Sequence, residues 1–228
     1  MPRKTKAIKE TDIRGGKPWL KKIGVTKYSI ETKDLHKTFL IVCEGQSEKL
    51  YFESIPVNTA EIKAIELGCS KTTLVENAIL IAENEEYDEK WCVFDMDIKP
   101  DVNGQFDDYN NAIKSAIEAG FKCAYSNDAF ELWYVLHYQY IDQEQNRSFF
   151  FKKLSEYWNM NYERDGKKIK FVRTIYKLLE DDPRASQASA IRNAKKLFKE
   201  QKDKVYHLQN PVTKIFELIE SLNKHLRQ

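Results

Sequence analysis

The sequence lacks any long hydrophobic run, and this absence argues against a membrane-spanning protein. Its longest apolar stretches, such as FLIVC at 39–43, are far shorter than the roughly 20 residues that a membrane-spanning helix needs. The first residues, MPRKTKAIKE, also lack the apolar core of a signal peptide. We therefore expect a cytoplasmic protein that does not cross a membrane.

Cysteines are few, and a nucleotide-binding motif is absent. The four cysteines have no C-x-x-C spacing, and two of them, Cys43 and Cys92, lie inside predicted buried strands. This pattern predicts reduced thiols in the core rather than zinc ligands or a disulfide framework. The sequence has no Walker A motif, so any dependence on ATP would come from a partner protein.

Charge is plentiful and strongly segregated along the 228 residues. Residues 1–37 carry a net charge of +7, residues 38–146 a net charge of −14, and residues 147–228 a net charge of +9. An acidic segment repels a polyanion unless a metal ion and basic flanks hold it, so this pattern favours a nucleic-acid partner. The alternative is that the basic helices present solvated faces and attract the acidic middle.

Strands alternate with helices across the acidic middle. Apolar runs predict strands at 38–43, 60–67, 91–94 and 121–125, with helices at 47–55, 70–87 and 107–119 between them. Beyond them, helical patterns continue at 130–140, 148–158, 170–181, 183–201 and 212–227. We therefore expect an α/β fold with a mostly parallel sheet, built as a basic arm over 1–35, a catalytic domain over 36–145 and a basic helical region over 146–228 packed on it.

Acidic residues directly follow two of these predicted strands. Glu44 follows the run that ends at Cys43, and Asp95 and Asp97 follow the run at 91–94. Ligands of a parallel sheet bind beyond the carboxyl ends of its strands, so these acids should converge on one hard cation such as Mg²⁺ or Mn²⁺. If the chain stays extended, Asp95 and Asp97 point to the same side and repel each other without a cation. Glu44, Asp95 and Asp97 are therefore the predicted metal ligands.

Simpler roles for the acids remain open. Lys99 is the only adjacent cation that could pair with the two aspartates, and Glu44 could instead stabilise the start of the next helix through the helix dipole. Glu48 is expected to be a solvated acid at that helix start. His137 is expected to be a buried histidine with a local hydrogen bond, with proton transfer as the alternative.

Four blocks, in the order IVCEGQSEKLYF, VFDMD, SNDAFELWYVLHY and NPVTKIFELIE, resemble the RloB family from about residue 36 to the end. The resemblance implies a Toprim-like, Rossmann-like catalytic domain in which Glu44, Asp95 and Asp97 bind Mg²⁺ and cleave or transfer phosphodiesters. It makes Glu131 a fourth catalytic candidate, and it implies an ATPase partner in prokaryotic defence. Many relatives have Asn-Pro where this chain has Asn127-Asp128, so a different local turn is expected there.

A basic stripe in the last third is the candidate nucleic-acid surface. Arg192, Lys195, Lys196 and Lys199 recur at the spacing of one helical face. A solvated face is the alternative interpretation. Together with the acids, the stripe predicts a metal-dependent nuclease, with either DNA or RNA, including tRNA, as substrate. A non-catalytic adaptor for nucleic acid or an ATPase, and a nucleotidyl transferase, are the competing hypotheses.

Overall fold

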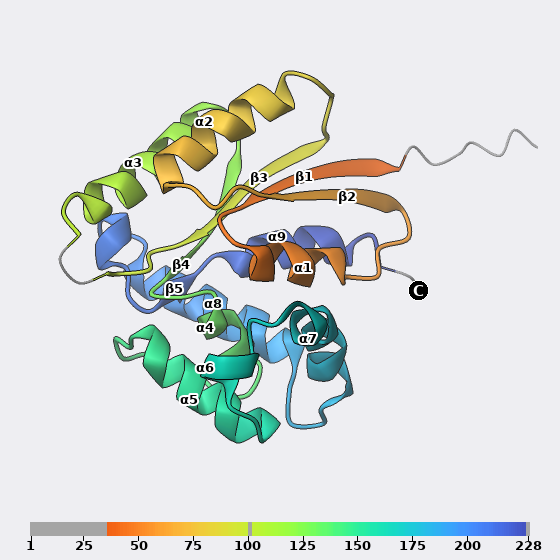
Figure 1. Cartoon of the computed structure of the whole chain (residues 1–228), viewed down its shortest axis with the longest axis vertical. Coiled ribbons are helices and arrows are strands. Elements are labelled where there is room, and N and C mark those ends of the chain that lie inside the picture. Colours follow the sequence, from red (N-terminus) through yellow and green to blue (C-terminus); the bar gives the residue numbers. More distant parts are fainter. Residues whose placement is uncertain (1–35, 100–101, 227–228) are drawn as a thin grey trace, which may run out of the picture. The chain divides into compact units, whose positions relative to one another are not determined.

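A mostly parallel sheet organises the chain in the computed structural model, which describes residues 36–99 and 102–226 (Figure 1). Its strands are β1 (Lys37–Cys43), β2 (Ala60–Glu66), β3 (Glu89–Asp95), β4 (Lys122–Asn127) and β5 (Val212–Thr213), in the order β2-β1-β3-β4-β5. The first four are parallel, and β5 runs antiparallel to β4. The predicted α/β fold with a mostly parallel, Rossmann-like sheet is confirmed.

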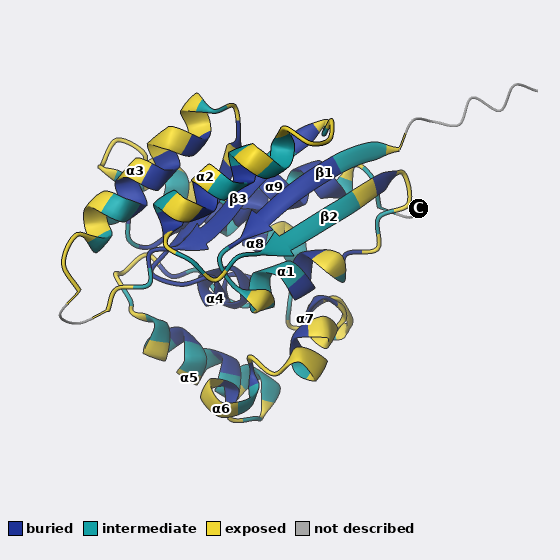
Figure 2. Ribbon diagram, turned by 45° about the horizontal axis from the view of Figure 1, so that its top comes forward, coloured by how far each residue is buried: buried dark blue, intermediate teal, exposed yellow. Residues whose placement is uncertain are grey.

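The central strands form because their apolar runs are buried on both faces. Side chains alternate across a strand, so Phe39 and Ile41 of β1 enter one core layer, and Leu40 and Val42 enter the other. Figure 2 shows β1 and β3 as the buried centre of the sheet. A parallel strand covered on both faces requires such a continuous apolar run, which explains why the sequence pattern located these strands well.

Helices cover both faces of the sheet. One face carries α2 (Lys71–Ala82) and α3 (Gln105–Glu118), and the other carries α1 (Gln46–Glu53), α4 (Glu131–Val135) and α9 (Ile215–Asn223) (Figure 1). The remaining helices are α5 (Arg147–Trp158), α6 (Tyr162–Asp165), α7 (Ile169–Asp181) and α8 (Gln187–Gln201), and η3 (Tyr206–Leu208) is a 3₁₀ turn. The predicted helical C-terminal region is therefore present. No helix in the described ranges is long and apolar enough to cross a membrane.

Local sequence signals set several helix ends. The hydroxyl of Ser70 accepts a hydrogen bond from the backbone N–H of Thr73 and caps the N-terminus of α2. Helix α1 begins at Gln46, one residue before the predicted start at 47, and Gly45 occupies its N-terminal capping position. The first turn of α1 therefore follows the end of β1 after only two residues.

Several predicted helices are shorter than expected: α2 ends at Ala82 rather than at residue 87, and α8 begins at Gln187 rather than at residue 183. The segment at 130–140 is helical only over α4, because bonds from His137 N–H to the Tyr134 carbonyl and from Tyr138 N–H to the Val135 carbonyl tighten the chain into a turn. At the C-terminal end, helix α9 starts at Ile215 rather than at residue 212. Val212 and Thr213 instead pair with β4 as strand β5, which is too short to produce a periodic pattern.

Candidate functional site

A pocket of about 230 Å³, here called the acid pocket, lies at the carboxyl ends of β1 and β3. It is lined by Glu44, Gly45, Gln46, Ser47, Glu48, Asp95, Asp97, Arg147 and Lys167. Because β1 and β3 are neighbouring parallel strands, the acidic residues at their carboxyl ends meet at one edge of the sheet. The structure thus brings the three predicted metal ligands to the same pocket.

Glu44 is fixed by the strands on either side of it. Its backbone N–H donates to the Val93 carbonyl at 3.0 Å, and its carbonyl accepts from Gly68 N–H at 3.0 Å. In the side chain, Oε1 accepts from Lys71 Nζ at 3.4 Å, whereas Oε2 is buried and has no hydrogen-bond partner in the described part of the chain. One carboxylate oxygen of Glu44 therefore remains available to a ligand.

Glu48 is a pocket residue that the sequence interpretation missed. It was expected to be solvated, but it lines the acid pocket, and its Oε2 is buried with no partner among the described residues. The carboxylate lies so close to Gly45 that a Cβ there would be 2.6 Å from Oε2. Burial, followed by repulsion from Glu131 and Glu44, raises the pKa of Glu48 to about 7.

Asp95 is the last residue of β3 and is almost fully buried. Its Oδ1 has no hydrogen-bond partner in the described ranges. Burial raises the pKa of Asp95 well above its usual range, and the carboxylates of Glu48 and Glu131 raise it further. The acids of the pocket therefore repel one another strongly when they are ionised.

Asp97 does not continue the strand as expected. Its φ of 46° is in the left-handed region, which aspartate tolerates better than most residues, so the period-two expectation fails after Met96. The carboxylate pairs with Arg147 Nη2 at 2.6 Å and with Lys99 Nζ at 3.5 Å. Lys99 is thus a partner, as the alternative interpretation allowed, but the shorter ion pair comes from α5.

Glu131 lies behind the acid pocket at the start of α4. It is buried, accepts a hydrogen bond from the Tyr162 hydroxyl at 3.2 Å, and is 3.7 Å from Lys167 Nζ. Its charge acts on Glu48 and Asp95, where it contributes to their raised pKa values. Glu131 therefore contributes to the electrostatics of the pocket without lining it.

The oxygen ligands of the pocket suit a hard cation, although its carboxylates are not close enough together to surround one. No three His, Cys, Asp or Glu side chains of residues 36–99 and 102–226 are placed closely enough to hold a metal ion. Among the described residues that line this pocket, however, every buried oxygen without a hydrogen-bond partner is a carboxylate oxygen, the kind of ligand that Mg²⁺ and Mn²⁺ prefer. They belong to Glu44, Glu48 and Asp95, whereas Asp97 is engaged by Arg147.

The predicted basic stripe lies on α8 and is partly neutralised. Lys195 Nζ lies 2.5 Å from a carboxylate oxygen of Glu220, and Lys196 Nζ is 4.1 Å from the centre of the Tyr140 ring. Neither these lysines nor Arg192 and Lys199 belong to the acid pocket, whose cations within the described residues are Arg147 and Lys167. The role of the stripe in nucleic-acid binding stays a prediction.

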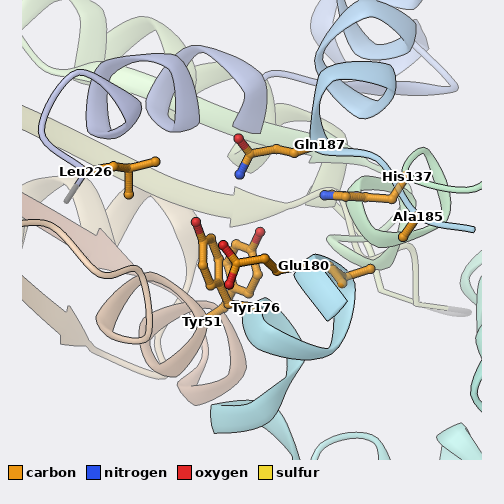
Figure 3. Close-up of a pocket in the computed structure, with 8 residues that line it drawn as sticks. Tyr51, His137, Tyr176, Glu180, Ala185, Gln187 and Leu226 are labelled. Carbon is orange, nitrogen blue, oxygen red and sulfur yellow. The ribbon is translucent and has the colours of Figure 1, made fainter. Parts of the chain in front are cut away.

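His137 is a buried histidine with a local hydrogen bond, as expected. Its side chain is 3% exposed, Nδ1 lies 2.9 Å from the Trp133 carbonyl oxygen, and burial lowers its pKa to about 4. It lines a separate pocket of about 270 Å³ with Tyr51, Tyr176 and Gln187 (Figure 3). His137 is therefore not among the side chains that line the acid pocket.

Fold and pocket together define the class of this molecule, an α/β protein with a Rossmann-like sheet and clustered carboxylates at its strand ends. A family model described as RloB-like protein matches residues 39–222, which is most of the chain. The chain therefore belongs to the RloB-like family, as its four sequence blocks predicted. No curated protein and no solved structure matches it. The matched span includes every residue of the acid pocket.

Proposed function

We propose that this protein is a nuclease that depends on a divalent cation and hydrolyses phosphodiester bonds of nucleic acid. The observation that carries the proposal is the packing of Glu44, Glu48 and Asp95 around one pocket, each with a buried oxygen that lacks a partner within the described chain. Repelling carboxylates with perturbed pKa values are typical of functional sites, where a ligand compensates the repulsion.

The residues of the pocket fit distinct roles in such a reaction. Glu44, Glu48 and Asp95 would hold the cation through carboxylate oxygens. Mg²⁺ or Mn²⁺, when bound, supplies Lewis-acid stabilisation of charge on the phosphate and lowers the pKa of water. Glu44, held through Oε1 by Lys71, keeps Oε2 free either as a ligand or to accept a proton from the attacking water.

The test is incubation of the full chain with Mn²⁺ and labelled single-stranded DNA, duplex DNA or tRNA. We expect cleavage of at least one substrate, its loss in EDTA, and a decrease of at least 100-fold in Asp95→Asn. Asp142→Asn is the matched control, because Asp142 is an exposed aspartate outside the pocket. Absence of cleavage across the panel, or full activity in Asp95→Asn, would refute the proposal.

A second candidate is a non-catalytic adaptor that binds nucleic acid or an ATPase. The pairing of Asp97 with Arg147 and the failure of three described acids to converge favour this alternative. Calorimetry with Mn²⁺ separates the two, because an adaptor would show no binding that depends on Asp95. Incorporation of labelled nucleotide onto a template would instead identify a nucleotidyl transferase.

We also propose that the nuclease is the effector of a prokaryotic defence system with an ATPase partner. The support is the family resemblance, since the RloB-like family model matches residues 39–222. The expected result is co-purification of a neighbouring-gene ATPase with the full-length protein. If nuclease activity is complete and unchanged by such ATPases, this part of the proposal fails.

A further inference from the structure

Two cations from the helical region reach the acid pocket. Arg147 is the first residue of α5, and Lys167 precedes α7; both line the pocket beside the carboxylates. The Arg147 Nη2 atom is 2.6 Å from Asp97 Oδ1, and Lys167 Nζ is 3.7 Å from Glu131 Oε1. Their side chains are 32% and 52% exposed, so a ligand that enters the pocket can reach both positive charges.

Asp128 holds Arg147 in a fixed position relative to Asp97. Its buried carboxylate accepts hydrogen bonds from the backbone N–H groups of Arg147 at 3.1 Å and of Ile98 at 3.2 Å. Its carbonyl accepts from Asp97 N–H at 3.0 Å. These three bonds join the ends of β3 and β4 to the start of α5. The backbone that carries the Asp97–Arg147 pair is therefore tied together before any ligand binds.

The guanidinium of Arg147 is not fully used by this pair. Its Nε is buried, and no atom of the described residues accepts a hydrogen bond from it. A guanidinium presents five N–H donors in a rigid fork that matches the oxygens of a phosphate. The pocket thus contains an anchored arginine whose buried Nε donor has no partner among residues 36–99 and 102–226, beside the acids that would hold a cation. Buried polar groups are nearly always hydrogen-bonded, so this Nε is a donor that a bound anion or an ordered water would satisfy.

We propose that Arg147 and Lys167 are the phosphate-binding residues of the acid pocket, and that Asp97 acts as a positioning residue for Arg147. The ligand is the phosphodiester backbone of a nucleic acid, and this identity rests on the proposed function. The basic stripe on α8 lies outside the pocket and is not needed for this contact. The acidic floor repels phosphate, so the two cations at its rim decide whether a strand can approach.

The experiment measures binding in EDTA, so that it does not depend on a metal or on cleavage. A fluorescent single-stranded oligonucleotide is titrated with the full chain over a range of salt concentrations. Each lost phosphate contact reduces the salt slope for a single strand by about 0.7, which corresponds to roughly fivefold weaker binding at 0.1 M salt. We expect this change in Arg147→Ala and about twice the change in slope when Lys167→Ala is added.

Control variants remove the same charge elsewhere. Arg173→Ala and Lys177→Ala alter exposed residues of α7 outside the pocket and should leave the slope unchanged. Arg147→Lys keeps the positive charge but lacks the planar set of guanidinium donors. This variant should therefore retain the salt slope of binding while binding the oligonucleotide more weakly than the parent. Circular dichroism of each variant verifies folding, and Arg147→Lys keeps the test valid if the alanine variant fails to fold.

Asp97 is tested by a double-mutant cycle with Arg147. If Asp97 positions the guanidinium, Arg147→Ala should weaken binding clearly less in an Asp97→Ala background than in the parent. Equal effects in both backgrounds would remove the positioning role. An unchanged salt slope in Arg147→Ala overturns the phosphate site even if Asp95→Asn abolishes cleavage. A reduced slope in a protein that never cuts supports the site while refuting the nuclease.

Discussion

Replacing Glu48 with glutamine should stabilise the metal-free protein, and more so at high pH. The Glu48 carboxylate is buried beside those of Glu131 and Glu44, and its pKa rises from 4.5 to about 7. A raised folded-state pKa means that the folded protein binds this proton more tightly than the unfolded chain does. The ionised carboxylate therefore destabilises the fold fully above about pH 7, and the penalty vanishes as the pH falls below 4.5.

The magnitude follows from these two pKa values. At 1.36 kcal/mol per pH unit, the difference between 4.5 and about 7 gives a penalty of about 3 kcal/mol near pH 8.5. Near pH 5.5 the folded-state carboxyl is mostly protonated, and about 1.4 kcal/mol remains. Glu48→Gln should therefore stabilise the metal-free protein by about 2 kcal/mol more near pH 8.5 than near pH 5.5.

Urea unfolding in EDTA across this pH range measures the effect. Glu53→Gln is the matched control, because Glu53 is an exposed glutamate at the other end of α1. Excess Mn²⁺ at 100 times its dissociation constant should add about 2.7 kcal/mol to the parent, and much less to Glu48→Gln. If the free energies of unfolding of the parent and Glu48→Gln differ by the same amount from pH 5.5 to 8.5, the pKa of Glu48 is not raised in the folded protein.

Two further outcomes test the neighbouring structure. Burial alone would raise the pKa of Glu89, but hydrogen bonds, led by that from Lys37, lower this pKa to about 2. The ionised Glu89 therefore stabilises the fold fully above pH 4.5, and this stabilisation is lost as the pH falls towards 2. Glu89→Gln should therefore cost on the order of 2–3 kcal/mol at neutral pH in urea unfolding, and an unchanged midpoint would contradict this. Gly45→Ala should displace the Glu48 carboxylate and weaken Mn²⁺ binding about tenfold in calorimetry, whereas unchanged affinity would exclude Glu48 as a ligand.

The sequence predicted the sheet where burial dictates the pattern. β1 and β3 are covered on both faces, so they require uninterrupted apolar runs, and these runs mark their positions in the chain. β5 could not be found in this way, because its two residues become a strand only by pairing with Ser126 and Asn127 of β4. Helix α4 was overestimated for a similar reason, since the tight turn at its end depends on local packing rather than on periodicity.

The candidate site was predictable only in part. Glu44 and Asp95 follow their strands directly, and parallel pairing of β1 with β3 brings them together. A signal for Glu48 was present, because a helix that starts at Gln46 turns its third residue back towards the strand end. The contact of Arg147 with Asp97 had no local signal, since it depends on how α5 is anchored by Asp128.

In the acid pocket, residues of the acidic middle segment lie beside cations of the basic C-terminal segment. The two explanations were attraction between the segments and binding of a polyanion, and the pairs Asp97–Arg147 and Glu131–Lys167 are compatible with both. Ion pairs of such exposed cations contribute little to stability, whereas burial and the neighbouring carboxylates raise the pKa of Glu48, so its ionised form opposes folding. Attraction between segments therefore does not account for the acid pocket. Net repulsion at one strand edge, beside an Arg147 Nε that is buried and has no acceptor in the described part of the chain, is the arrangement expected where a cation and a phosphate together complete the site.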